Sequence, residues 1–175
     1  MCIRDAGISD LNSIVQIYNN TIGDRMATAD TKPITVESRV SWLQNRDFRY
    51  RPVWVMETQA SNLNDNKIIG WLSFNDFYGR PAYQHTAEIS VYVAKDYRRQ
   101  GVGSKLLTKA IANCPRLQIN TLLAFVFAHN QPSINLFQNY GFQSWGLLSQ
   151  VAKLDEQTKD LAILGLKIAD CERTT

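Results

Sequence analysis

The sequence predicts a mixed α/β domain, because apolar segments of strand character alternate with segments of helical periodicity along the whole chain. The 175 residues are 45% hydrophobic, which suits a domain with a core of its own. No internal repeat, low-complexity tract or long linker divides the chain. We therefore expect one domain over residues 1–175, with a loose tail at its end.

The first fifty residues predict one short strand and two helices. The strand covers residues 2–5, and apolar residues at helical spacing then indicate a helix over residues 11–23. Residues 24–33 show no periodicity and lie where a loop over a substrate could lie, although a plain connector is the alternative. Thr35 is placed to cap a second helix that includes residues 36–43.

The middle of the chain predicts three strands. Residues 52–57 and 67–74 are apolar and flank a polar turn at 61–66, so we expect a hairpin. Residues 85–93 are rich in β-branched side chains and contain one acid, Glu88, in an otherwise buried pattern. A carboxylate at such a position requires a structural or a chemical reason.

The remainder predicts a helix, then a strand and a second helix, and finally two strands. A glycine loop at 98–104 leads from the strand at 85–93 into an amphipathic helix over 104–114. Residues 119–127 form a continuous apolar strand typical of parallel sheets, and Asn130 begins a short helix that Gly141 ends. The last two strands are expected near residues 142–148 and 160–168.

Charge and composition narrow the classes of function. Nineteen Lys and Arg against sixteen Asp and Glu leave a net charge of +3, too weak and too scattered for a nucleic-acid footprint. Three cysteines without CxxC spacing favour a reducing compartment. No apolar run is long enough to span a membrane, and acids stand where a signal peptide is apolar, so we expect a cytoplasmic protein. The two histidines lack other ligands at metal-binding spacing, so we expect no metal.

The loop from Arg98 to Ser104, RRQGVGS, has the chemistry of a phosphate site. Its glycines permit a tight turn that brings main-chain N–H groups toward a ligand, and the following helix adds partial positive charge. A P-loop requires GxxxxGK[ST], and the dinucleotide fingerprint requires a third glycine where this chain has Leu106. An isolated GxG is usually a plain turn, so its meaning depends on the surrounding pattern.

A second motif, N-x-x-S-x(7)-G-F, follows the next strand. Its residues are Asn130, Ser133, Gly141 and Phe142. With both motifs, the sequence resembles the GNAT superfamily of acetyl-CoA-dependent N-acetyltransferases. The segments at the start and before the glycine loop resemble its phosphinothricin and methionine sulfoximine N-acetyltransferase branch, over almost the whole chain. The resemblance implies a mixed central sheet, flanked by helices and splayed between a strand ending at Val93 and a parallel strand starting near Ile119.

The same resemblance implies that acetyl-CoA binds in this splay. Main-chain groups of Val91 and Val93 are expected to pair with the pantetheine, the glycine loop to hold the pyrophosphate, and Asn130 and Ser133 to contact the far arm. The expected cofactor-binding residues are Val91, Tyr92, Val93, Arg98, Arg99, Gln100, Gly101, Val102, Gly103, Ser104, Asn130 and Ser133.

Glu88 matches the acid of the branch pattern T-[AV]-E-x-S-V-Y-V, which is taken to be the general base. A substrate amine must lose its proton before it attacks a thioester, and burial raises the pKa of a carboxylate toward that task. A structural acid bonded to a neighbouring group is the alternative. The main-chain N–H of Val91 is expected to stabilise the oxyanion formed in the attack.

The proton donor for the departing thiolate differs from the family pattern. Members commonly have Tyr, and this branch His, seven residues after the motif asparagine, where this chain has Phe137. Either Tyr140 or Tyr92 replaces that acid, or water protonates a thiolate whose pKa, by analogy with cysteine, is about 8.5. We favour water.

Acceptor recognition is expected from Arg80, Tyr83 and Lys153, which resemble branch positions near the acceptor. An arginine suits a carboxylate or phosphinate because its fork pairs with both oxygens, although solvated surface cations are the alternative for Arg80 and Lys153. The branch often has an aromatic residue where this chain has Ala29, which points to a different acceptor pocket. The tryptophans are expected in the core: Trp42, Trp54, Trp71 and Trp145.

The predicted function is transfer of the acetyl group of acetyl-CoA to the amino group of a small amino-acid-like substrate, of the phosphinothricin or methionine sulfoximine type. Protein N-termini or polyamines are alternative acceptors, and a polyamine is disfavoured because the expected acceptor loops carry Arg25, Arg80 and Lys153 instead of acids. A non-catalytic acyl-CoA sensor is the alternative that Phe137 supports. We also expect a homodimer without nucleic-acid or membrane partners.

Overall fold

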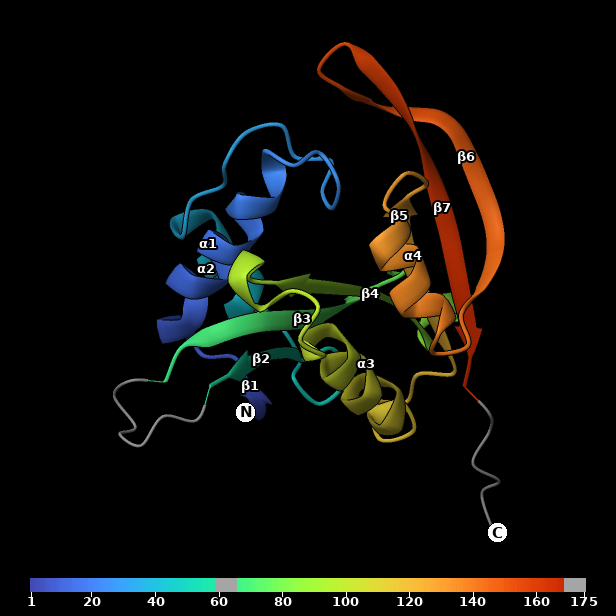
Figure 1. Cartoon of the computed structure of the whole chain (residues 1–175). Coiled ribbons are helices and arrows are strands. Elements are labelled where there is room, and N and C mark those ends of the chain that lie inside the picture. Colours follow the sequence, from blue (N-terminus) through green and yellow to red (C-terminus); the bar gives the residue numbers. More distant parts are fainter. Residues whose placement is uncertain (59–65, 169–175) are drawn as a thin grey trace, which may run out of the picture.

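The computed structural model describes residues 1–58 and 66–168, and its centre is a seven-stranded sheet (Figure 1). The strand order is β1-β2-β3-β4-β5-β7-β6, and only β4 (Thr86–Val93) and β5 (Thr121–Phe127) are parallel neighbours. The other strands are β1 (Cys2–Asp5), β2 (Val53–Glu57), β3 (Ile68–Asp76), β6 (Gln143–Leu154) and β7 (Gln157–Lys167).

Strands β4 and β5 separate soon after they meet. They pair from Thr86 to Glu88 on β4 and from Thr121 to Leu123 on β5, and both strands then continue without pairing to each other. The sheet is therefore splayed between its two parallel strands, beginning at Glu88. The predicted mixed α/β fold and its splay are confirmed.

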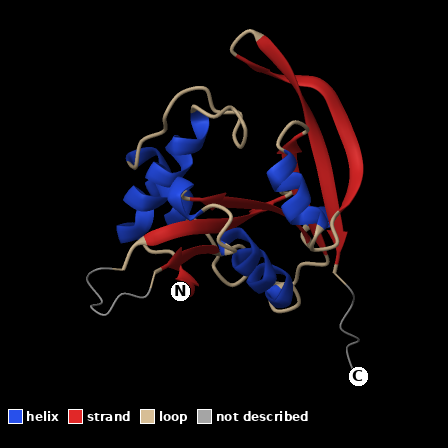
Figure 2. Cartoon of the chain, viewed as in Figure 1, coloured by secondary structure: helices blue, strands red, loops and turns tan. Residues whose placement is uncertain are grey.

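Helices cover both faces of the sheet (Figure 2). The helices are α1 (Leu11–Ile22), α2 (Glu37–Gln44), α3 (Val102–Asn113) and α4 (Gln131–Gln138), with short 3-10 turns at Ile8–Asp10, Pro81–Tyr83 and Lys95–Tyr97. Alternate residues of β2 point to opposite faces, so Trp54 and Met56 pack with α3 while Val53 and Val55 pack with α1. The core therefore has two parts, one on each face.

Most predicted elements are present. Strands β2 and β3 form the expected antiparallel hairpin, and Asn130 caps α4 by accepting a hydrogen bond from the main-chain N–H of Ser133. Gly141 follows α4 with a positive φ of 86°, which favours glycine. Most of the polar turn predicted at 61–66 and the tail at 169–175 lie outside the described residues.

The last two strands are longer than predicted. Strand β6 continues to Leu154 and β7 begins at Gln157, so the two form a hairpin with Asp155 in its turn at a φ of 54°. The polar sequence of this segment hid the pairing, because the outer part of the hairpin extends beyond the body of the sheet and buries little apolar surface (Figure 1).

The prediction of a buried Trp145 is wrong. Its residue on β6 is 45% exposed, and its ring lies over Gly165 of β7, where a Cβ atom would stand 2.1 Å from the ring. Trp54 and Trp71 are buried as expected, while Trp42 is half-buried on α2. The Trp145 ring thus packs on β7 at a residue without a side chain, and not in the core.

Helix α3 begins in a notch of the sheet that Gly70 provides. The Val102 side chain is buried against β3, and a Cβ atom at Gly70 would lie 2.8 Å from Val102 Cγ1 and 3.0 Å from the carbonyl oxygen of Tyr92. The start of α3 therefore depends on the missing side chain at Gly70.

Replacing Gly70 with Ala should lower the free energy of unfolding by about 1–3 kcal/mol, because the added methyl group overpacks this contact. Urea denaturation of both proteins measures the difference. Gly23→Ala is the matched control, since Gly23 has helical backbone angles and open space at its Cβ position. Equal losses in the two variants would contradict the notch.

Candidate active site

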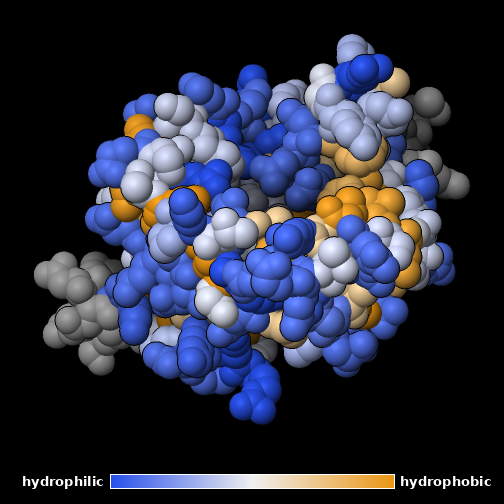
Figure 3. All heavy atoms as spheres, turned by 90° about the horizontal axis from the view of Figure 1, so that it is seen from above, coloured by the Kyte–Doolittle hydropathy of each residue, from blue (hydrophilic) through white to orange (hydrophobic). Residues whose placement is uncertain are grey.

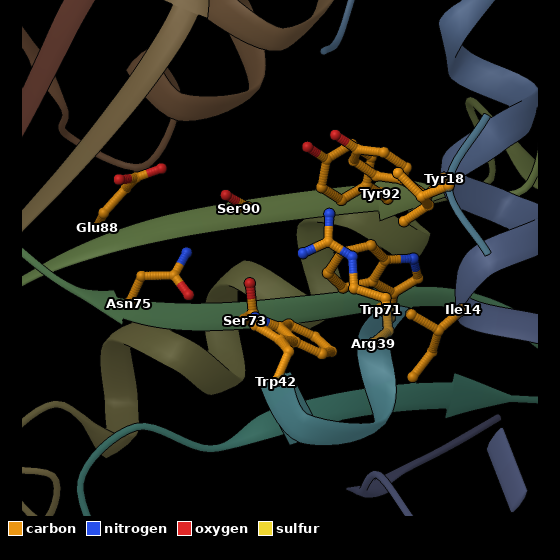
Figure 4. Close-up of a pocket in the computed structure, with 11 residues that line it drawn as sticks. Ile14, Tyr18, Arg39, Trp42, Trp71, Ser73, Asn75, Glu88, Ser90 and Tyr92 are labelled. Atoms are coloured by element: carbon orange, nitrogen blue, oxygen red, sulfur yellow. The ribbon is translucent and has the colours of Figure 1, made fainter. Parts of the chain in front are cut away.

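A pocket of about 200 Å³ lies on the face of β3 and β4 that α1 and α2 cover (Figure 4). Its floor comes from alternate residues of the two strands, which face the same side because strand side chains alternate. The cross-strand pairs are Asn75 with Glu88, Ser73 with Ser90, and Trp71 with Tyr92. One end of the pocket, at Glu88, therefore reaches the point where the sheet splays.

The half-buried Glu88 carboxylate has no partner in the described part of the chain. Among residues 1–58 and 66–168 it has no hydrogen-bond or ion-pair partner, and burial raises its pKa above the ordinary value. The side chain points away from β4 into the open part of the site (Figure 4). The structural alternative, an acid bonded to a neighbour, has no support in these contacts, so Glu88 is free to take up a proton.

Arg46 fixes the orientation of the Asn75 side chain, which lies beside Glu88. The half-buried Arg46 guanidinium lies 4.4 Å from the ring centroid of Trp42 and donates to Asn75 Oδ1 and to the carbonyl oxygen of Phe74. Burial lowers the pKa of Arg46 to about 10. Because a guanidinium only donates, it fixes the amide oxygen and leaves the amide nitrogen of Asn75 toward the pocket (Figure 4).

Aromatic rings close the other end of the pocket. The Tyr92 ring stacks on Trp71 with centroids 4.5 Å apart and meets Tyr18 edge-on at 5.1 Å. Tyr18 donates to Asp30 Oδ2 at 2.6 Å, so the segment at 24–33, which was predicted as a substrate-covering loop or a connector, is anchored to a residue that lines the pocket.

The splay leaves main-chain groups of β4 without a neighbouring strand. The N–H of Ala94 donates to Ile69 of β3, and the ladder alternates, so Tyr92 also directs its main-chain groups toward β3. Val91 and Val93 direct theirs to the opposite edge, which β5 has left. Tyr92, by contrast, offers the pocket its side chain.

The glycine loop combines a turn with a close approach of two helices. Gly101 precedes α3 at a φ of 78° with open space at its Cβ position, and Arg99 also has a positive φ of 60°. A Cβ atom at Gly103 would instead lie 3.1 Å from Leu136 of α4. The first three N–H groups of α3, from Val102 onward, are the donors that a helix start leaves unpaired.

Arg98 of the glycine loop and Asn130 of the second motif are tied to the loop that follows α1. Arg98 donates to Asp24 at 3.2 Å, and Gln100 donates to the carbonyl oxygen of Asp96. The Asn130 amide nitrogen donates to the carbonyl oxygen of Met26 at 2.9 Å, while its oxygen caps α4. Asn130 thus has a structural role beside the one expected for it.

The residues expected to bind the acceptor do not line the pocket that contains Glu88. Arg80 is exposed before the turn Pro81–Tyr83, and the Tyr83 ring packs against Phe77 at 5.4 Å. Lys153 lies on β6 near the hairpin tip, where its exposed ammonium is 3.6 Å from Glu156. None of these three residues is among those that line the pocket.

The candidates for the missing acid also lie apart. The Phe137 ring is buried and meets Phe142 edge-on at 5.0 Å. Thr108 of α3 donates to the Tyr140 hydroxyl at 3.0 Å. Burial raises the pKa of Tyr92, whose ring is four residues along β4 from Glu88, about 13 Å at strand spacing.

Sequence reasoning missed the contribution of α2. Arg39 and Trp42 point toward the pocket from this helix, three residues apart and hence on one helix face (Figure 4). The sequence did carry a signal for the part of the pocket formed by β4. Every second residue after Glu88 faces the same side of the strand, which selects Ser90 and Tyr92 as pocket residues.

The comparisons with known proteins agree with this geometry. The model of the Acetyltransferase (GNAT) family matches residues 25–142. The chain belongs to the GNAT family of acetyltransferases. It is thus an acetyl-CoA-dependent N-acetyltransferase, and the resemblance stated from the motifs is confirmed.

Relatives of this GNAT acetyltransferase match nearly its full length. "Putative phosphinothricin acetyltransferase YwnH" of Bacillus subtilis is 44% identical over 97% of this chain and 100% of its own. The L-methionine sulfoximine/L-methionine sulfone acetyltransferase of Pseudomonas aeruginosa is 30% identical over 95% of this chain and 94% of its own. A phosphinothricin acetyltransferase structure from Sinorhizobium meliloti, in complex with acetyl-CoA, superimposes with a TM-score of 0.84 at 25% identity, covering 99% and 91%.

No cluster of three His, Cys, Asp or Glu side chains in residues 1–58 and 66–168 could hold a metal ion. Within the same ranges, every helix is too short or too polar to cross a bilayer.

Glu88→Gln should stabilise the folded protein at neutral pH. The raised pKa means that the folded state binds the Glu88 proton more tightly than the unfolded state, so wild-type stability falls as pH rises through the folded pKa. Glutamine has no charge to desolvate. Thermal unfolding from pH 5 to pH 8 should therefore give a difference that grows with pH, and a constant difference would show that the carboxylate is not desolvated.

Proposed function

We propose that this acetyltransferase acetylates the primary amine of a small amino-acid-like acceptor, with Glu88 as the general base. The supporting observation is a partnerless carboxylate of raised pKa at the end of a small pocket, where the sheet splays. The names of its relatives include acetyltransferases of phosphinothricin and of methionine sulfoximine. A polyamine is a poorer acceptor for a pocket whose α2 wall carries Arg39.

The residues present fit acetyl-CoA, which supplies an activated acetyl group when bound. The main-chain groups of Val91 and Val93, which face no neighbouring strand at this edge, suit the amides of a pantetheine, as an added strand would. The N–H groups at the start of α3, after the open turn at Gly101, suit a pyrophosphate. Ser133, beside Asn130 at the start of α4, remains the expected contact to the far arm.

Glu88 and Val91 then perform the chemistry expected of this chain. Glu88 removes a proton from the ammonium group of the acceptor, directly or through water, and its raised pKa makes it a stronger base. The N–H of Val91, at the free edge of β4, donates to the acyl oxygen as negative charge develops on it. Water returns a proton to the sulfur, since Phe137 carries no acid.

The wider setting is also proposed. We expect a cytoplasmic enzyme, in keeping with free thiols at Cys2 and Cys114. We expect a homodimer through β6, an edge strand with exposed apolar side chains on the side of the molecule where hydrophobic surface gathers in Figure 3. Those side chains are Trp145, Leu147, Leu148 and Val151. Sedimentation equilibrium of the full chain measures this association.

Glu88→Gln should keep acetyl-CoA affinity and lower kcat by about 10²-fold or more at neutral pH, the usual contribution of a positioned base. Thiol release with a panel of amino acids and analogues measures the rate, and calorimetry measures acetyl-CoA binding. The deficit should shrink at high pH, where free amine is more abundant. If the wild-type protein bound acetyl-CoA but acetylated no amine of the panel, the result would support the acyl-CoA sensor instead.

Tyr92→Phe and Tyr140→Phe should each leave kcat within about threefold of wild type, because water supplies the proton to sulfur. The pH dependence of kcat for the acceptor found above tests this expectation. A loss of 10²-fold with an altered alkaline limb in either variant would assign the acid to that tyrosine.

A further inference from the structure

We propose that Arg39 binds the carboxylate of the acceptor and restricts this enzyme to amines that carry an anionic group nearby. The inference rests on the proposed function and deepens it, because it names the residue that selects the substrate class. It also replaces Arg80 and Lys153, the cations expected from the sequence, with one inside the pocket.

The pocket presents one positive and one negative side chain that do not neutralise each other. Among its described lining residues the titratable groups are Arg39, Glu88, Tyr18 and Tyr92. Arg39 comes from α2 and Glu88 from β4, and no ion pair of 4 Å or less joins them. An amino acid has the complementary pattern, with an ammonium group for Glu88 and a carboxylate for Arg39.

Arg39 has aromatic neighbours but no polar side-chain partner in the described part of the chain. Its guanidinium lies 5.7 Å from the ring centroid of Tyr18 and 5.7 Å from that of Trp42, so two aromatic side chains flank it. Within residues 1–58 and 66–168 it has neither a hydrogen-bond acceptor nor an ion-pair partner. The nearby acid, Asp30, accepts from the Tyr18 hydroxyl instead.

Two arginines that follow α2 contrast with Arg39. Arg46, on the same side of the sheet, donates to carbonyl and amide oxygens, and Arg51 pairs with Asp76 at 2.7 Å. The N–H donors of the Arg39 guanidinium are therefore available to a bound molecule. A carboxylate fits best, since its two oxygens match the fork.

The floor between the two charges is polar. Ser90 lies between Glu88 and Tyr92 on β4, Ser73 pairs with it on β3, and the Arg39 guanidinium extends over this part of the floor (Figure 4). An acceptor bound by Arg39 therefore lies along the serines with its amine directed toward Glu88. An amine of the same size that has no anionic group cannot form the contact with Arg39.

The test compares Arg39→Gln with wild type on L-methionine sulfone and on its carboxamide, which keeps the amine and loses the anion. We expect KM for the acid to rise about 10- to 100-fold, the range of a charge-assisted hydrogen bond, and KM for the amide to change less than about threefold. Arg39→Lys should recover part of the loss, since lysine offers a single point charge. Calorimetry with the N-acetylated acid should show the same loss of affinity in the absence of turnover.

Arg49→Gln is the matched control, because it removes the same charge from an exposed position after α2. It should leave both substrates and acetyl-CoA affinity unchanged. Equal losses on acid and amide in Arg39→Gln, or an acid-specific loss in Arg80→Gln instead, would overturn the proposal. So would a wild-type enzyme that acetylates only amines lacking an anion, whereas failure to acetylate either compound or any amino acid would overturn the proposed function itself.

Discussion

The short pairing of β4 with β5 is the constraint on which the site depends. Three residues of each strand hold the two parts of the sheet in one hydrogen-bonded layer, and beyond them β4 has a free edge inside the molecule. Main-chain N–H and C=O groups at such an edge require partners, and an unsatisfied one costs as much as a lost hydrogen bond. The fold therefore keeps a binding surface made of backbone, which no change of side chain removes.

Side chains of β4 alternate between the two faces of the sheet, so one set contributes to the core and the other to the pocket. Ala87 and Ile89 face the core beneath α3, while Glu88 and Tyr92 face the pocket under α1 and α2. Because neighbouring residues serve opposite faces, a shift of one residue in register would bury the acid and expose the core. The antiparallel pairing with β3 holds that register from Ala87 to Val93.

The sequence was informative wherever a pattern was local. The strand around Glu88, the cap at Asn130 and the turn at Gly101 were each predicted from neighbouring residues, and each lies where expected. Arg39 could not be assigned to the pocket, since its place depends on how α2 packs across residues far away in the chain. The burial of Trp145 was predicted wrongly because period and composition do not distinguish a core strand from an outer hairpin.

The loop between α1 and α2 depends on contacts that the chain makes late in synthesis. Arg98 binds Asp24, which lies 74 residues earlier in the chain. Asn130 binds Met26, 104 residues earlier, and Asp155 binds Arg25, 130 residues earlier. Contacts of such separation require the closure of long loops, which delays their formation. The contact between Arg25 and Asp155 cannot form until the chain has been made as far as the turn between β6 and β7. A chain that ended before that turn would leave the loop beside the pocket without this support.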